Sequence, residues 1–421
     1  MSKTAILIMQ IGTILLVSGV LGRLCKRFHQ PRVMGEMLAG ILLGPSLLGW
    51  VAPGISAALF PPGSLAALNA LSQVGLLVFM FVVGLELNPR LLQGRGRAAL
   101  LISHASITMP AFLGMLLAIY LYPRLSNDHV RFTHFALFLA ISMSITAFPV
   151  LARILTERRL LRTEVGVMAI AGAAFGDVTA WCLLAVVVAL VRAGYLSGMS
   201  FWGTILGSFA YVGVAIFLLK PLLARLIKWL QGRGSGAREI VPVCLLAAFG
   251  SALITEGLGI HAVFGAFLIG ALMPKDREFV ETLTERLEGV TLLLLPLFFA
   301  ATGLRTSIAL VSGAEMWFYC ALAVAVAIVG KFGGATIAAR ASGMGWRESG
   351  AIGVLMNTRG LMELIVLNIG LEIGVISPAL FTILVVMALV TTFMAGPLIE
   401  LIYPKRISDQ EPAAVAAEMA A

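Results

Sequence analysis

A single carboxylate, Asp177, lies in the middle of a long apolar stretch. The stretch runs from Val165 to Val191 and contains no other charged residue. About 20 apolar residues are enough to cross a bilayer as a helix. A charged side chain at that depth costs at least a few kcal/mol, so an intramembrane acid is a candidate functional site. The chemistry open to such a group is the binding of a proton or a small cation.

A second charge, Lys331, lies in another apolar stretch, from Trp317 to Ala339. At 1.5 Å per residue, Asp177 lies about 20 Å and Lys331 about 13 Å from the inner end of its helix, which places both near the midplane. Two interpretations follow. The pair is either a static ion pair that holds two helices together, or a titrating site at which a cation and a proton compete for one carboxylate.

Neutral oxygens for such a site come from a polar group in the stretch before Asp177. Ser142, Ser144 and Thr146 alternate with apolar residues there. Alkali cations prefer hard oxygen ligands of this kind. We therefore predict a Na⁺ or K⁺ site formed by Asp177 with these three residues.

Arg359 and Glu363 form a further intramembrane pair. They are four residues apart and so share one helix face. They pair with each other, or Arg359 instead reaches Glu86 or Glu36. An arginine keeps its charge and cannot carry a proton usefully, so we expect a mainly structural role.

Composition indicates a membrane protein that crosses the bilayer many times. The chain has 421 residues, of which 60% are hydrophobic and 12% charged. Soluble proteins have about 25% charged residues. The net charge of +9 is assigned to cytoplasmic loops rather than to nucleic-acid binding. The four cysteines are scattered without a CxxC motif, which gives no sign of a disulfide framework, a metal cluster or another cofactor.

Apolar patterning predicts an all-α polytopic fold with about 13 transmembrane spans. The predicted spans are 4–21, 33–50, 65–87, 98–122, 135–155, 165–191, 201–230, 240–254, 260–273, 290–304, 317–339, 351–371 and 378–401. With the N-terminus outside, most of the 30 Lys and Arg residues fall on the cytoplasmic loops, as the positive-inside rule expects. The C-terminus is then cytoplasmic, and residues 404–421 form a short disordered tail. An amphipathic segment, 275–288, precedes the tenth span and is either a solvated connector or a regulatory helix.

Thirteen spans divide into six, one and six, which predicts two repeats of inverted topology, a common plan of secondary transporters. This plan pairs the fifth span with the twelfth, and both contain breaks. The stretch 142–149, which ends in Pro149, interrupts the former, and residues 357–360 interrupt the latter. Unwound backbone at membrane depth persists only where it is buried in protein or lines a cavity. The alternative is a simple proline kink.

Several motifs together resemble the monovalent cation:proton antiporter-2 family, which contains Kef-type and sodium/proton antiporters. The resemblance covers essentially the whole membrane part. It rests on GEMLAGILLGP at 35–45, FVVGLEL at 81–87, TAFPVLAR at 146–153, HAVFGAFLIG at 261–270, PLFFA at 296–300 and MNTRGLMEL at 356–364.

The resemblance implies two crossed, broken helices in a moving core and a scaffold that forms a homodimer. Residues 1–403 would form one exchanger domain. Its core would comprise about 98–191 and 317–401, its scaffold about 4–90 and 240–304, and its linker helix about 201–230. Asp177 matches the family's cation-binding aspartate, Thr146 a polar residue on the first broken helix, and Lys331 the lysine opposite the acids.

One position departs from the electrogenic sodium/proton members, which carry two adjacent acids. Gly176 occupies the first of the two positions. Lys331 therefore lacks a partner acid, and its protonation state is open. With one carboxylate, two protons are not easily exchanged for one cation, which predicts electroneutral one-for-one exchange.

These observations predict a plasma-membrane antiporter that exchanges Na⁺ or K⁺ for H⁺ by alternating access. The main alternative is a Kef-like K⁺ efflux channel or transporter. An intramembrane enzyme is disfavoured, because the sequence shows no clear Ser/His pair, second deep aspartate or HExxH motif. The sequence does not separate Na⁺ from K⁺.

Overall fold

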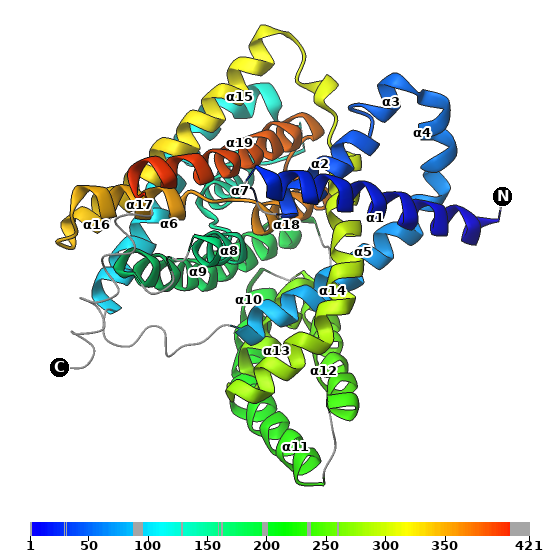
Figure 1. Ribbon diagram of the computed structural model, residues 1–421, viewed down its shortest axis with the longest axis vertical. Coiled ribbons are helices and arrows are strands. Elements are labelled where there is room, and N and C mark those ends of the chain that lie inside the picture. The colour runs from blue at the N-terminus through cyan, green and yellow to red at the C-terminus, as the bar shows by residue number, and fades with distance from the viewer. Residues whose placement is uncertain are drawn as a thin grey trace. The chain divides into compact units, whose positions relative to one another are not determined.

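The computed structural model describes residues 2–28, 30, 32–86, 96–127, 129–158, 160, 163–195, 201–233, 237–258 and 261–404. Within these ranges the chain is helical, with connecting turns and without a strand (Figure 1). Ten helical segments there are long and apolar enough to cross a membrane. The predicted all-α polytopic fold is confirmed.

The predicted count of 13 spans stays a prediction. Three of the predicted spans lie outside the ten long segments, and each has a local reason. The ninth coincides with a helix of 11 residues. The fifth and the twelfth are each interrupted, so that neither half reaches the length of a full crossing. The predicted tail, 404–421, falls outside the described residues except for Pro404.

The chain divides into two compact units. Unit 1 contains residues 1–19, 36–88 and 185–304. Its helices, some of which continue into unit 2, are α1 (Lys3–Arg27), α2 (Arg32–Leu43), α3 (Leu48–Val51), α4 (Pro53–Leu59), η1 (Pro62–Ser64), α5 (Leu65–Glu86), α10 (Phe201–Val214), the π-helical turn η3 (Ala215–Leu219), α11 (Lys220–Gly232), α12 (Ala237–Gly257), α13 (Ala262–Leu272) and α14 (Arg277–Arg305).

Helices α5 and α13 approach each other closely in unit 1, because a glycine of each helix faces the backbone of the other. A Cβ atom at Gly84 would overlap the carbonyl oxygen of Phe267, and one at Gly270 would overlap that of Phe81. Small residues of this kind let membrane helices approach closely enough for backbone contact. The FVVGLEL and HAVFGAFLIG motifs therefore form one helix–helix contact.

The C-terminal ends of α5 and α13 share one lysine. The last carbonyls of a helix have no acceptor role inside the helix and need other donors. Lys275 Nζ donates to the carbonyl oxygens of Gly84 at 2.9 Å, Leu85 at 2.8 Å and Gly270 at 3.1 Å. Burial, with a smaller contribution from the charge of Lys220, lowers the pKa of Lys275 to about 8. This lysine ties the two helix ends together.

The predicted amphipathic segment, 275–288, is not a separate helix. Helix α14 runs without interruption from Arg277 to Arg305 and joins most of that segment to the predicted tenth span. Its apolar residues Phe279, Leu283 and Leu287 are buried. Gly289 does not end the helix, because a lone glycine lowers helix stability by only about 1 kcal/mol.

Unit 2 contains residues 20–35, 89–184 and 305–421. Its helices, of which α9 continues into unit 1, are α6 (Gly96–Leu125), α7 (Phe132–Ser144), α8 (Phe148–Glu157), α9 (Glu164–Tyr195), η4 (Ile308–Leu310), α15 (Gly313–Ile328), the π-helical turn η5 (Val329–Gly333), α16 (Gly334–Ala341), α17 (Trp346–Met356), α18 (Leu361–Glu372) and α19 (Pro378–Ile402). The predicted roles of core and scaffold for parts of the chain stay predictions.

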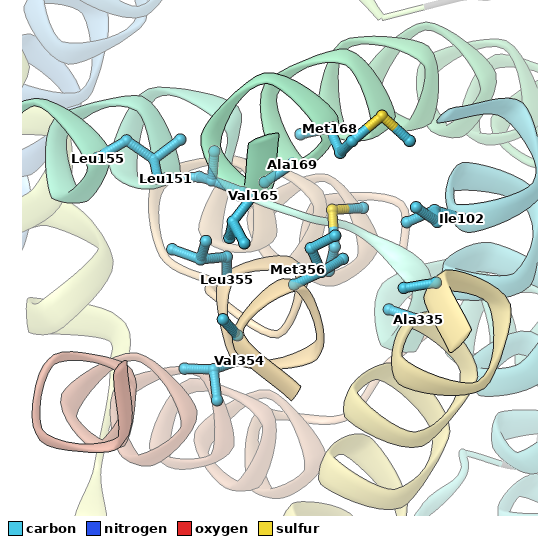
Figure 2. Close-up of a cluster of buried hydrophobic side chains, with 14 of the residues drawn as sticks. Ile102, Leu151, Leu155, Val165, Met168, Ala169, Ala335, Val354, Leu355 and Met356 are labelled. Atoms are coloured by element: carbon cyan, nitrogen blue, oxygen red, sulfur yellow. The ribbon is translucent and has the colours of Figure 1, made fainter. Parts of the chain in front are cut away.

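A buried apolar cluster joins helices of unit 2, including α19 through Ala395 and Ile399 (Figure 2). Further side chains come from α6, α8, α9, α16 and α17, and include Ile102, Leu151, Leu155, Val165, Met168, Ala169, Ala335, Val354, Leu355 and Met356. The cluster packs α9, which carries Asp177, against the second half of one broken helix and the first half of the other. It therefore fixes the elements that present the predicted site residues.

Candidate cation and proton site

The first broken helix is interrupted at Ile145, Thr146 and Ala147 rather than at Pro149. Helix α7 ends at Ser144 and α8 begins at Phe148, so Pro149 is the second residue of α8. A proline is well tolerated in the first turn of a helix, where its missing N–H would have no partner anyway. The residue before a proline also avoids the helical region. The proline therefore starts the second half-helix, and the break precedes it.

The second break lies where the sequence predicted it. Residues 357–360 separate α17 from α18. Gly360 has a φ of 138°, a conformation that side chains other than glycine rarely adopt. A larger residue at this position would be strained, so the glycine of the MNTRGLMEL motif has a backbone reason.

The two breaks cross and satisfy each other's backbone groups. The Ala147 N–H donates to the Thr358 carbonyl at 3.0 Å, and Thr146 Oγ1 donates to the Met356 carbonyl at 3.4 Å. Thr392 of α19 brackets the second break, since its hydroxyl accepts from the Arg359 N–H at 3.1 Å and donates to the Arg359 carbonyl at 2.8 Å. Unwound backbone is thus hydrogen-bonded within the protein, as is required at membrane depth.

Arg359 and Glu363 are fully buried and pair with each other at 2.9 Å. The guanidinium also donates to the carbonyls of Ser142, at 3.0 Å, and Met143, which lie at the C-terminal end of α7. Ser142 Oγ donates to the other carboxylate oxygen of Glu363 at 2.6 Å. Of the partners considered for Arg359 from sequence, the structure selects Glu363. The pair links the end of α7 to the start of α18.

Lys331 is also fully buried, in the π-helical turn η5. Its Nζ donates to the carbonyl of Ser106 at 3.3 Å and to that of Ser144. The Ser144 hydroxyl in turn donates to the carbonyls of Ala140 and Ile107. Lys331 is therefore bonded to backbone oxygens at the edge of the first break, and it lies near enough to Asp177 for each group to affect the ionisation of the other.

Asp177 lies on α9 with 3% of its surface exposed. Its helix packs on α6 through two glycines one turn apart. A Cβ atom at Gly172 would lie 3.5 Å from Ile102 Cγ2, and one at Gly176 would lie 3.5 Å from Ser103 Oγ. These ordinary contact distances show that α9 approaches α6 closely beside Asp177.

Seven of the eight predicted site residues belong to unit 2, where six of them form separate hydrogen-bonded groups around the crossing and Asp177 lies on the neighbouring helix α9. The seven are Ser142, Ser144, Thr146, Asp177, Lys331, Arg359 and Glu363. Glu86 belongs to unit 1, where it is the last residue of α5 and its side chain is exposed. The three hydroxyls predicted as cation ligands already donate within the protein, so only their lone pairs remain for a cation. The roles of all eight stay predictions.

Sequence reasoning missed two residues of this region. Thr392 lies in an apolar span that shows no break, so nothing marks it as a partner of the unwound segment. Ser103 lies in α6, where its only signal is the Ser103/Ser106 spacing of one helical turn. Serines at such spacing are common in membrane helices.

Comparison with known proteins shows matches along nearly the whole chain. Residues 12–403 match the family described as sodium/hydrogen exchanger, transmembrane. The Na⁺/H⁺ antiporter NhaS4 of Synechocystis sp. is 40% identical over 95% of this chain and 98% of its own. The K⁺/H⁺ antiporter 1 of Saccharomyces cerevisiae is 35% identical over 97% of this chain, but this chain spans only 47% of that protein.

A solved structure shows the same fold. The sodium proton antiporter MjNhaP1 from Methanocaldococcus jannaschii matches with a TM-score of 0.69, over 98% of this chain and 100% of that one. The sequence identity is 14%, so this match supports the fold alone. Several plant cation/H⁺ antiporters from Arabidopsis thaliana are about as similar to this chain as NhaS4, and this chain spans about half of their length.

Proposed function

Because the chain belongs to the sodium/hydrogen exchanger family, we propose that it exchanges a monovalent cation, Na⁺ or K⁺, for H⁺ across a membrane. The observation that carries the proposal is the carboxylate of Asp177, buried on a helix that packs against two crossed, broken helices. The relatives named above as Na⁺/H⁺ and K⁺/H⁺ antiporters support the same class of substrate.

The proposed mechanism uses one carboxylate for both ions. Ionised Asp177 takes the cation from one side of the membrane, with neutral oxygens from the crossing region completing its shell. Protonated Asp177 carries the proton in the opposite direction. Unit 2 moves as the core and exposes Asp177 to either side in turn, so that the two ions never share the site. When the site is empty and Asp177 is ionised, the core differs by one unit of charge from both loaded forms, and in the proposed cycle only the loaded forms move.

Charge counting supports electroneutral exchange. The buried pair of Arg359 and Glu363 contributes no net charge. Whatever charge Lys331 carries is the same in both loaded forms, provided that its backbone partners hold it in one protonation state. Asp177 is neutralised once by the cation and once by the proton. The core therefore carries the same charge in both directions, and one cation is exchanged for one proton.

We place the protein in the plasma membrane as a homodimer, with its N-terminus outside and its C-terminus in the cytoplasm. The dimer and the location follow from the family resemblance. The orientation follows from the concentration of Lys and Arg on one set of loops.

The test is proton flux in sealed vesicles that contain the purified protein and an internal pH dye. Pulses of Na⁺, K⁺, Li⁺ and Rb⁺ should each be compared with a choline pulse. We expect Na⁺ or K⁺ to drive proton movement at a rate that does not change when the membrane potential is clamped at different values. A channel would instead give a current at zero proton gradient, and voltage-dependent exchange would contradict the one-for-one stoichiometry.

A further inference from the structure

The buried hydroxyls of Ser103 and Thr336, both in unit 2, make no hydrogen bond to a described residue, and of the two only Ser103 lies beside the helix position next to Asp177. Ser103 of α6 has no exposed surface, and its Oγ makes no hydrogen bond to any described residue. Its neighbours on the same helix behave differently, because Ser106 Oγ donates to the Ser103 carbonyl and Thr108 Oγ1 donates to the His104 carbonyl. Serine hydroxyls in helices usually bond back in this way. A buried hydroxyl without a hydrogen-bond partner is unfavourable, so a ligand that binds its oxygen would remove this cost.

The Ser103 hydroxyl faces the empty side-chain position of Gly176. A Cβ atom built there would meet Ser103 Oγ at 3.5 Å, and no other atom of a neighbouring described element lies within 4 Å of it. Gly176 immediately precedes Asp177 on α9. The absent side chain thus leaves a space beside Asp177 that an unpaired oxygen borders.

Helix α6 also connects Ser103 with the rest of the crossing. One turn further along α6, the Ser106 carbonyl accepts from Lys331 and the Ile107 carbonyl accepts from Ser144 Oγ. Ser103 therefore contacts α9, which carries Asp177, one turn of α6 away from the carbonyls that bind the lysine and serine at the first break. Unlike these groups, its oxygen is not already engaged.

We propose that Ser103 Oγ is an oxygen ligand of the transported cation, on the side of the site where Gly176 supplies no acid. The inference rests on the proposed function of Asp177. Alkali cations need several oxygens, and one carboxylate provides at most two. A hydroxyl adds an oxygen without adding a charge, so the balance between cation and proton is preserved. A proton on Asp177 needs no such shell, so Ser103 acts on cation binding and not on proton binding.

Two substitutions of Ser103 distinguish the effect of its hydroxyl oxygen from the effect of its side-chain volume. Ser103→Ala removes the hydroxyl, and Ser103→Cys nearly keeps the size but replaces a hard oxygen with a soft sulfur. For both variants we expect the cation concentration at half-maximal exchange to rise about tenfold, equivalent to about 1.4 kcal/mol. The pH of half-maximal exchange at saturating cation should not move. Since the hydroxyl is unpaired, the melting temperature without cation should not fall.

Two glycine substitutions provide a matched pair. Gly176→Ala adds a methyl group 3.5 Å from Ser103 Oγ, and Gly172→Ala adds one at the same distance from Ile102 Cγ2, one turn away. Both methyl groups fit at ordinary contact distance. We expect Gly176→Ala to weaken cation binding by covering the Ser103 hydroxyl, and Gly172→Ala to leave it unchanged.

The readouts are exchange in vesicles and the cation-dependent rise in melting temperature of the detergent-solubilised full chain, for Na⁺ and K⁺ separately. The second readout still works in a variant that does not transport. Wild-type cation affinity in Ser103→Ala, or a normal Ser103→Cys beside a weakened Ser103→Ala, would overturn the inference. Asp177→Asn is measured in parallel. If it retains exchange, the proposed function fails, whereas an inactive Asp177→Asn with normal Ser103 variants refutes the role of Ser103 alone.

Discussion

We expect the buried pair of Arg359 and Glu363 to stabilise the fold only while both side chains are present. Both side chains are fully buried, and the guanidinium holds two carbonyls at the end of α7 in addition to the carboxylate. Arg359→Met leaves Glu363 as an uncompensated buried charge, which costs about 3–5 kcal/mol. It also leaves the carbonyls of Ser142 and Met143 without their donor, at about 1–3 kcal/mol for an unpaired group.

Because these terms overlap, we expect Arg359→Met to lower the free energy of unfolding by about 4 kcal/mol or more. Glu363→Met leaves an unpaired guanidinium that still holds its two carbonyls, and should cost about 3 kcal/mol. The double variant removes both charges and replaces them with apolar volume. It should therefore be more stable than Arg359→Met alone, which requires a coupling energy larger than the roughly 3 kcal/mol that Glu363→Met costs by itself.

The assay is reversible unfolding in mixed detergent micelles, with the two single variants, the double variant and the wild type forming one cycle. Arg158 and Glu400 provide the control, because they pair at the same 2.9 Å but 64% of the Glu400 side chain is exposed. Their coupling energy should be about 0–1 kcal/mol. If the losses at Arg359 and Glu363 simply add, the pair does not act as a unit and the reasoning is refuted.

Two further predictions concern pH and voltage. In the folded protein Lys275 has a pKa of about 8, against an ordinary value of 10.5, so the unfolded chain binds this proton more tightly. The stability contributed by Lys275 should therefore rise between pH 8 and 10.5. The melting temperature of the wild type minus that of Lys275→Met should increase over that window. A signed difference that stays constant or decreases would contradict the assigned burial. Gly176→Asp restores a second acid next to Asp177, in a space that accepts a Cβ atom at ordinary contact distance. If exchange then carries one net charge, 100 mV contributes about 2.3 kcal/mol, and the variant but not the wild type should respond to a clamped voltage in vesicles; an unresponsive, active variant would show that the number of acids does not set the stoichiometry.

Sequence patterns predicted the helical elements of this protein well, because apolar length and charge position act locally. Asp177 and Lys331 stood out as lone charges in apolar stretches, and the glycine and polar residues of 357–360 marked the second break. The first break falls within the predicted stretch 142–149, but Pro149 lies in the first turn of the second half-helix and does not itself interrupt the helix. Helix α14 was divided in two, because its first half has a polar face and its second half does not.

The contacts of the candidate site were harder to predict from the sequence. Ser142 and Glu363 are 221 residues apart in the chain, and no local pattern could select that hydrogen bond. For Arg359 the nearby partner was one of three considered, and helical spacing alone did not choose it. Ser103 resembles any serine of a membrane helix until its missing partner and its position opposite Gly176 are seen. Burial and hydrogen-bond accounting, rather than residue type, identify it.

The most direct test of the account is cation-driven proton flux by Asp177→Asn in vesicles with an internal pH dye. The substitution keeps the size of the side chain but removes the charge that both ions neutralise. Glu164→Gln, at the first turn of the same helix, is the matched control. We predict a folded Asp177→Asn protein whose exchange falls to the level of empty vesicles, while Glu164→Gln exchanges as wild type. An Asp177→Asn variant with wild-type, pH-coupled cation flux would contradict the central claim.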